Sequence, residues 1–258
     1  NATRGISYQT AGYPRPAVIS RDVWCQAAAC DYTSGLEYED ASHMIVHHTV
    51  SANSSSDWAA VVRAIWAFHT YPPSANCGSC RGWGDIGYNY LIDRNGYIYE
   101  GHMNEDYWNL DVIGTHAGDA NRGGMGTSLI GTFTNSSEYP VYDVPPAAMQ
   151  NALMDLFAWK AGQRGIDLFD SSRMPDNDLF WGLPHIMGHR DVYGGLNTLC
   201  PGGNAHAMLP AIREGVAARL GFSDGYIYVD ELSGDFVKSN ANWYEAQRGC
   251  GHNLHAYY

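Results

Sequence analysis

The sequence predicts an α/β fold in which a mixed central β-sheet is flanked by about three main helices. Short β-branched apolar runs alternate along the chain with segments whose apolar residues recur at helical spacing, as expected when helices cover a sheet. An Asn95-Gly96 turn signal between two strand-like runs indicates a hairpin, so the sheet has antiparallel neighbours as well. With 258 residues, 45% of them hydrophobic, the chain can form one large domain with a proper core.

The predicted strands are short apolar runs that end in polar residues or turns. They cover residues 44–50, 87–93, 97–100 and 128–133. Residues 186–191 are interpreted as a further strand end or turn. The first run, Met44 to Val50, is rich in β-branched residues and carries histidines at its polar end.

Three helices are predicted from N-cap residues, proline stops and apolar spacing. The first has N-cap candidates in residues 54–57 and runs to about His69, before Pro72-Pro73. The second begins at Pro145-Pro146 and has an inward stripe that includes Met149, Leu153, Leu156 and Phe157. The third carries Leu209, Ile212, Val216 and Leu220.

The chain divides into three parts by composition. Residues 1–16 are an extended lead-in segment, residues 17–222 form the main domain, and residues 223–258 form an appended β-rich tail. The chain opens with Asn-Ala-Thr-Arg, which we interpret as the start of a processed, mature chain, and it contains no run of 18 apolar residues that predicts a transmembrane helix.

A formal net charge of -12 argues against nucleic acid or an anionic membrane as the main partner, because both require a basic surface. The sequence does not predict an oligomeric state.

Six cysteines include two close pairs, Cys25 with Cys30 and Cys77 with Cys80. In a processed chain, such pairs favour short-loop disulfides and secretion, to the extracellular space or the cell wall. The alternative is a structural zinc site with these four cysteines as ligands. Neither the disulfide nor the zinc interpretation uses Cys200 or Cys250.

Two histidines and a cysteine are candidate ligands of one catalytic Zn2+ ion. His47 stands at the end of an apolar strand, and His189 is followed eleven residues later by Cys200. Two imidazoles and a thiolate suit zinc, and three protein ligands leave the fourth position open, as a catalytic site requires. Such a site could hydrolyse an amide.

The chain resembles the peptidoglycan recognition proteins and the related phage-lysozyme-type N-acetylmuramoyl-L-alanine amidases over roughly residues 17–222. Seven sequence blocks occur in the family's order. They are residues 19–24, 45–49, 85–90, 97–101, 126–131, 188–192 and 198–202.

The resemblance implies a function and a set of residue roles. It implies a zinc amidase that cleaves between the lactyl group of N-acetylmuramic acid and the L-alanine of the peptidoglycan stem peptide. His47, His189 and Cys200 correspond to the family's zinc ligands, Tyr88 to the tyrosine that assists catalysis, and Thr198 to a residue that polarises the scissile region.

Further matches imply a groove for the muramyl peptide of peptidoglycan, with the zinc site at its floor. The residues at the family's groove positions are His48, Thr49, His69, His116 and Asn121, and we expect Trp83 to border the same groove. The sequence departs from the family at His102, where many members carry arginine after Tyr-Glu-Gly. An enlarged acidic and aromatic loop then replaces the short dipeptide that helps to select the third stem-peptide residue, so the preference for a diaminopimelate or a lysine stem peptide stays open.

Two other functions compete with this one: a peptidoglycan-binding module without catalysis, and an inert interaction domain with incidental zinc. Retention of Cys200, both histidines and Tyr88 favours the enzyme, because non-catalytic members typically replace the cysteine. The tail, residues 226–258, resembles the start of a golvesin-like or xanthan-lyase-associated β-module.

Overall fold

A six-stranded sheet forms the centre of the computed structural model, which describes residues 12–26, 30, 35–103, 108–138, 142–175, 182–194 and 197–221. Beyond these it describes only the backbone of three short strands, β9 (Ile227–Val229), β10 (Phe236–Lys238) and β11 (His255–Tyr257), which pair in the order β10-β9-β11. Residues 1–11 of the predicted lead-in segment, and Cys250, lie outside the described residues. The predicted division into three parts stays a prediction.

The sheet has the strand order β1-β4-β3-β5-β2-β8. Its strands are β1 (Val18–Ile19), β2 (His43–His48), β3 (Tyr90–Ile92), β4 (Ile98–Glu100), β5 (Gly124–Leu129) and β8 (Ile186–Gly188). Neighbours run parallel except β3 and β4, the antiparallel hairpin around Gly96. The predicted mixed sheet is therefore confirmed. Two short strands, β6 (Ser171–Ser172) and β7 (Leu183–Pro184), pair separately.

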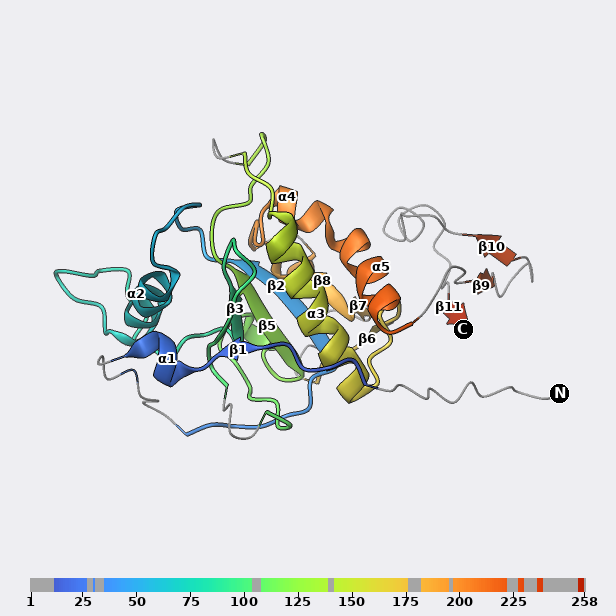
Figure 1. Cartoon of the computed structure of the whole chain (residues 1–258), viewed down its shortest axis with the longest axis horizontal. Coiled ribbons are helices and arrows are strands. Elements are labelled where there is room, and N and C mark those ends of the chain that lie inside the picture. Colours follow the sequence, from blue (N-terminus) through green and yellow to red (C-terminus); the bar gives the residue numbers. More distant parts are fainter. Residues whose placement is uncertain are drawn as a thin grey trace.

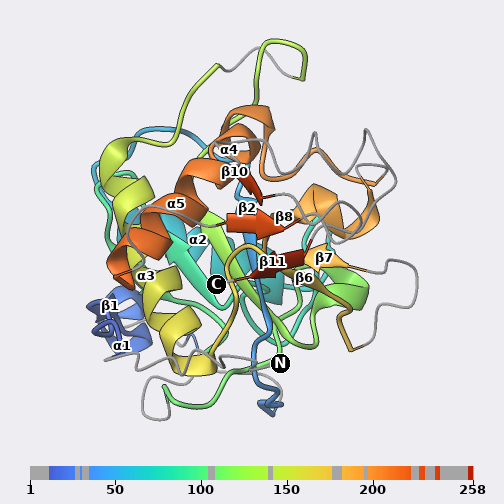
Figure 2. The same cartoon turned by 90° about the vertical axis from the view of Figure 1, so that its right-hand side faces the viewer.

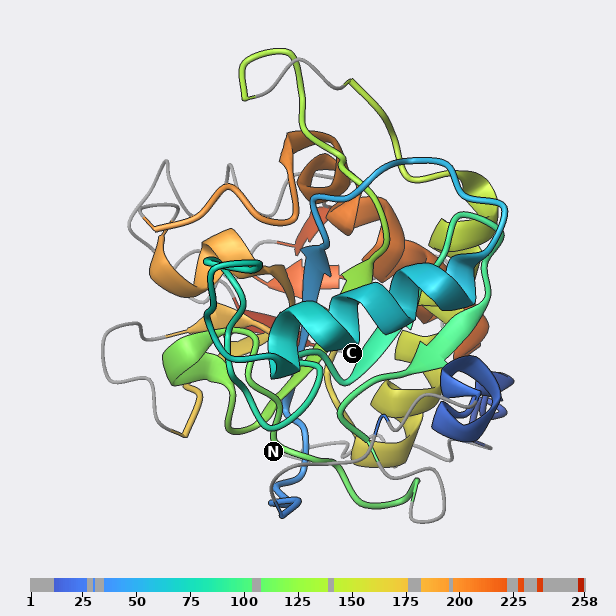
Figure 3. The same cartoon turned by 90° about the vertical axis from the view of Figure 1, so that its left-hand side faces the viewer.

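Helices cover both faces of the sheet (Figure 1). They are α1 (Arg21–Cys25), α2 (Trp58–Thr70), α3 (Ala147–Arg164), α4 (Gly203–Ala207) and α5 (Leu209–Arg219), with 3-10 turns η2 (Gly118–Ala120) and η3 (His189–Tyr193). Helix α2 lies across one face (Figure 3), and α3 and α5 pack together on the opposite side (Figure 2). None of the described helices is long and apolar enough to cross a membrane.

Alternation along the strands divides the core between the two faces. On β3, Tyr90 and Ile92 belong to the apolar cluster of α3 and α5, whereas Leu91 belongs to the cluster of α1 and α2. On β2, Met44 and Val46 also face α3 and α5. His47 therefore points to the other face, the one that α2 partly covers.

Local sequence accounts for the bounds of the helices. Asp57 caps α2, because its carboxylate accepts a 2.9 Å hydrogen bond from the Ala60 backbone N–H, and α3 begins directly after Pro146. Gly165 ends α3 in a left-handed conformation with φ 65°, which glycine adopts without strain.

The predicted strand over residues 128–133 is wrong in its bounds, because β5 begins at Gly124 and ends at Leu129. Its first three residues, Gly124 to Gly126, pair with His43 to Ile45 of β2. Two of these three are glycines, which are depleted in strands, so pairing in the folded sheet overrides local propensity.

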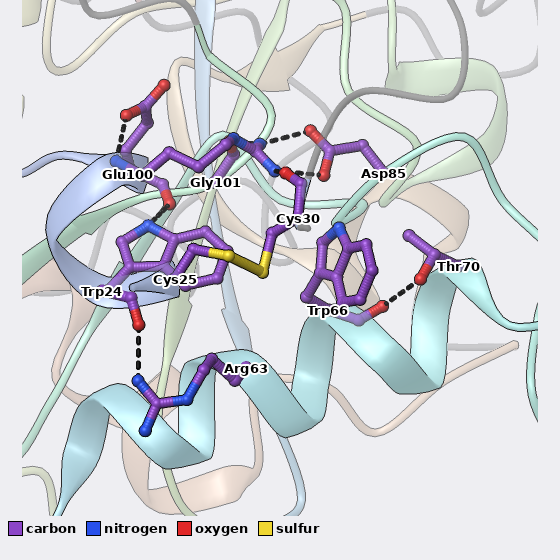
Figure 4. The surroundings of a disulfide bond; sticks show 10 residues. Trp24, Cys25, Cys30, Arg63, Trp66, Thr70, Asp85, Glu100 and Gly101 are labelled. Carbon is purple, nitrogen blue, oxygen red and sulfur yellow. Dashed lines mark hydrogen bonds and ion pairs between the residues drawn. A yellow bond between two sulfur atoms is a disulfide. The ribbon is translucent and has the colours of Figure 1, made fainter. Parts of the chain in front are cut away.

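The four cysteines of the two close pairs form two disulfides, Cys25–Cys30 and Cys77–Cys80. The short-loop disulfide prediction is confirmed and the alternative four-cysteine zinc site is wrong. Figure 4 shows the Cys25–Cys30 bond beside Trp24 and Trp66. The Cys30 carbonyl accepts a 2.8 Å hydrogen bond from the guanidinium of Arg21, so one end of this disulfide is bonded to a buried charged side chain.

Candidate metal centre and groove

Three donor side chains from separate parts of the chain converge beside the sheet. His47 is the fifth residue of β2, His189 follows β8 directly, and Cys200 lies in the loop before α4. Strands β2 and β8 are parallel neighbours, with Val46 opposite Gly188, so their ends bring the two histidines together. One nitrogen of each imidazole and the Cys200 sulfur all lie within 4.8 Å of one another.

The donor geometry fits zinc. His47 Nδ1 lies 3.6 Å from Cys200 Sγ. Tetrahedral zinc, with bonds of about 2.3 Å to sulfur and about 2.05 Å to nitrogen, separates two such ligands by about 3.6 Å. In the part of the chain that the structure describes, no other set of three or more His, Cys, Asp or Glu side chains is grouped in this way.

Burial keeps these donors neutral in the absence of a metal. It lowers the pKa of His47 well below its usual value and that of His189 to about 4, so both imidazoles keep a lone pair. It raises the pKa of the Cys200 thiol to about 12, although the His48 N–H, 3.4 Å from the sulfur, and Arg190 oppose the rise. A metal that bound here would displace the thiol proton.

The other nitrogen of His47 is also held. His47 Nε2 lies 3.0 Å from Nδ1 of His116, and the two rings meet nearly edge to face. His116 in turn places its Nε2 3.3 Å from the Gly124 carbonyl oxygen.

Tyr88 stands between two histidines of the site. Its ring centroid lies 5.2 Å from that of His47 and 5.5 Å from that of His69. Burial raises the pKa of Tyr88, so the hydroxyl stays protonated. A protonated phenol in this position can donate a hydrogen bond.

Thr198 lies beside Cys200, one of the three candidate donors. Its Oγ1 accepts a 3.1 Å hydrogen bond from the Cys200 backbone N–H. The hydroxyl proton is not used by that bond, so it can be donated to another acceptor in the groove.

A groove with a volume of about 750 Å³ opens over the three donors. Ten of the eleven residues predicted for the site line it: His47, His48, Thr49, His69, Trp83, Tyr88, His116, His189, Thr198 and Cys200.

The histidines of the groove wall are held in neutral form. His48 Nδ1 accepts a hydrogen bond from the Phe133 N–H at 3.3 Å, and His69 Nδ1 accepts one from the Gly87 N–H at 3.1 Å. Burial is the main cause that lowers the pKa of each to about 4. The His69 ring also packs on Trp83 with centroids 4.8 Å apart, so the wall is aromatic and carries no charge at these residues.

Asn121 is the one predicted site residue outside the groove lining. Its side-chain oxygen accepts hydrogen bonds of 2.8 Å from the backbone N–H groups of His116 and Ala117. The five-residue spacing of His116 and Asn121 therefore reflects a local contact that fixes the backbone under His116. Contact of Asn121 with substrate stays a prediction.

The sequence analysis missed several residues of the groove lining. These are Val50, Ile65, Phe68, Arg81, Thr132, Thr134, Glu138 and Leu199. Arg81 brings a positive charge to the groove and stacks on Phe68 and Trp83, with its guanidinium carbon 5.6 Å and 5.8 Å from the two ring centroids. Its position two residues before Trp83 is the one sequence signal that could have identified it.

His102, where the chain departs from the family pattern, turns away from the groove. Its Nδ1 lies 2.9 Å from a carboxylate oxygen of Asp85, which also binds Arg21. His102 is 8% exposed and does not line the groove. In this chain the residue belongs to a buried charge cluster.

Comparison with known proteins connects this chain to one family. The family model described as N-acetylmuramoyl-L-alanine amidase matches residues 37–203. Peptidoglycan-recognition protein SC2 of Drosophila melanogaster is 32% identical over 120 residues, which are 46% of this chain and 58% of that protein. An N-acetylmuramoyl-L-alanine amidase of Sus scrofa is 30% identical over 170 residues, which are 64% of this chain and 22% of that protein. The chain thus spans less than two thirds of the length of each of these relatives.

Solved structures have the same fold. Wild-type Drosophila PGRP-LB superposes with a TM-score of 0.53 at 27% identity, over 76% of this chain and 93% of that one. A PGRP-LB variant in complex with tracheal cytotoxin also gives 0.53 at 27% identity, over 75% of this chain and 93% of that one.

Proposed function

The chain belongs to the N-acetylmuramoyl-L-alanine amidase family, whose model matches more than half of it, and on that premise we propose that it is a zinc-dependent amidase of peptidoglycan. The bond cleaved is the amide between the lactyl group of N-acetylmuramic acid and the L-alanine of the stem peptide. The observation that carries this proposal is the convergence of His47, His189 and Cys200 within 4.8 Å at a groove.

These three residues hold the metal in our proposal, because two neutral imidazoles and a sulfur are a zinc donor set and leave one position for water or substrate. A zinc ion there would supply Lewis acidity and lower the pKa of a bound water towards neutrality. The groove above the donors gives a substrate carbonyl access to that position.

Tyr88 and Thr198 are the catalytic residues that the chain itself supplies in this proposal. The Tyr88 hydroxyl, kept protonated by burial, donates a hydrogen bond to the amide oxygen as negative charge develops on it. Thr198 is anchored by the Cys200 N–H and directs its own proton into the groove, where it orients the scissile amide.

The groove wall binds the muramyl peptide in this proposal. His48, Thr49, His69, Trp83 and His116 line it, and their uncharged imidazole and indole rings suit a ligand that combines sugar and peptide. A PGRP-LB variant of the same fold is described in complex with tracheal cytotoxin, which supports a ligand of this class. Two disulfides support a secreted location.

Metal analysis combined with muropeptide digestion tests the proposal. We expect about one zinc per chain and release of a peptide with a free N-terminal L-alanine, and loss of that release after zinc is removed with a chelator. Tight binding of muropeptide without release would favour the non-catalytic binding module and overturn the amidase.

A further inference from the structure

We infer that His116 is a positioning residue that holds His47 in the one tautomer able to bind a metal through Nδ1. The inference rests on the proposed zinc site, which it deepens, and on the chain of hydrogen bonds from the Gly124 carbonyl through His116 to His47.

The carbonyl at one end of this chain sets the protons. A carbonyl oxygen only accepts, so His116 Nε2, 3.3 Å from the Gly124 oxygen, carries a proton. His116 is 8% exposed, and no carboxylate pairs with it among the described residues, so the ring is neutral and its Nδ1 has a lone pair.

The same logic then applies to His47. Its Nε2, 3.0 Å from the His116 Nδ1 lone pair, must be the donor and carry the proton. Neutral His47 therefore has its lone pair on Nδ1, the nitrogen that lies 3.6 Å from the Cys200 sulfur. Ligands of metals are commonly oriented in this way by the hydrogen bond that their second nitrogen makes.

His116 is itself held on both sides. A Cβ added to Gly126 would lie 2.5 Å from its ring, and one added to Gly114 would lie 2.6 Å from it, so the imidazole occupies space that two glycines leave free. Asn121 fixes the backbone N–H of His116. The position of His116 is thus determined by Gly114, Gly126, Asn121 and the Gly124 carbonyl, none of which belongs to a substrate.

Two variants separate hydrogen bonding from packing. His116→Asn keeps an acceptor close to the position of Nδ1, whereas His116→Leu fills the space without one. Because loss of such outer partners typically weakens metal binding about 10- to 100-fold, we expect His116→Leu to lose zinc affinity by that factor and His116→Asn to keep it within about threefold.

Zinc affinity is measured by competition with a chelator on the full chain, using zinc alone as the probe. The matched control is His43→Leu, because His43 is a buried histidine on the same strand whose ring bonds Ser42 and two backbone carbonyls. We expect it to leave the zinc affinity unchanged. Equal affinity of His116→Leu and wild type, or equal losses in His116→Leu and His116→Asn, would overturn the inference.

A second readout needs no metal. Nitrogen-15 NMR of the zinc-free protein reports which imidazole nitrogen carries the proton, and we expect Nε2 for both His47 and His116. A proton on His47 Nδ1 would overturn the inference even if the protein bound zinc. Failure of the wild type to bind zinc, with the expected tautomers present, would instead reject the proposed function. Should His116→Leu not fold, Gly126→Ala displaces the ring and is expected to weaken zinc binding as well.

Discussion

Replacement of Tyr88 by phenylalanine removes one hydroxyl from the proposed site and leaves the ring in place. The ring is held by His47 and His69, with centroids 5.2 Å and 5.5 Å away, and Phe keeps those contacts. A hydrogen bond to developing negative charge contributes about 2 to 4 kcal/mol. This corresponds to a loss of about 30-fold to 1,000-fold in kcat.

The assay is steady-state release of peptide from a soluble muramyl peptide, with the zinc content of each sample measured in parallel. Because the bond strengthens in the transition state, we expect kcat to fall while KM and zinc content change little. Tyr90→Phe is the matched control, since the Tyr90 hydroxyl is buried on the other face of β3 and has no hydrogen-bond partner among the described residues. A zinc-loaded Tyr88→Phe with kcat within threefold of wild type would refute the role of the hydroxyl.

Two further predictions concern stability. Burial lowers the pKa of His43 and of His69 from 6.5 to about 4, so the unfolded chain binds protons that the folded chain does not, and stability falls as the pH drops from 6.5 towards 4. Each of these histidines changes the free energy of unfolding by up to about 1.4 kcal/mol per pH unit. In urea unfolding of the zinc-free protein, His43→Gln should therefore reduce the slope of unfolding free energy against pH by up to that amount. An unchanged slope would contradict this. Asp85→Asn leaves Arg21 buried without its carboxylate and should cost about 3 to 5 kcal/mol in urea unfolding. The exposed pair of Asp57 and Arg63 is the control, and we expect Asp57→Asn to lower the free energy of unfolding by less than about 1 kcal/mol. Equal losses in the two variants would contradict a stabilising role of the buried pair of Arg21 and Asp85.

Most of the fold could be predicted because local patterns agree with the tertiary structure. The apolar run of β2, the Asn-Gly hairpin and the proline at the start of α3 each carry their signal within a few residues. The start of β5 could not be predicted, because Gly124 and Gly126 have no strand propensity and become a strand only through pairing with β2. A side chain at position 126 would collide with the His116 ring, which comes from another segment, so only the folded structure explains the glycine there.

The site was predictable as a set of residues but not as an arrangement. Resemblance to a family supplied His47, His189 and Cys200, and the structure brings them together. The contact between His116 and His47 spans 69 residues and has no sequence pattern. Arg81 and Glu138 were missed for the same reason, since a single charged residue in a loop is usually solvated and only the fold turns these two towards the groove.

Hydrolysis of a muramyl peptide in water enriched in oxygen-18, followed by mass spectrometry of both products, tests the central claim most directly. An amidase with the proposed site adds water to the lactyl carbonyl, so one heavy oxygen should enter the new lactyl carboxylate and none the peptide with its free L-alanine. Label in a peptide fragment, or no cleavage by the zinc-loaded protein, would contradict the account.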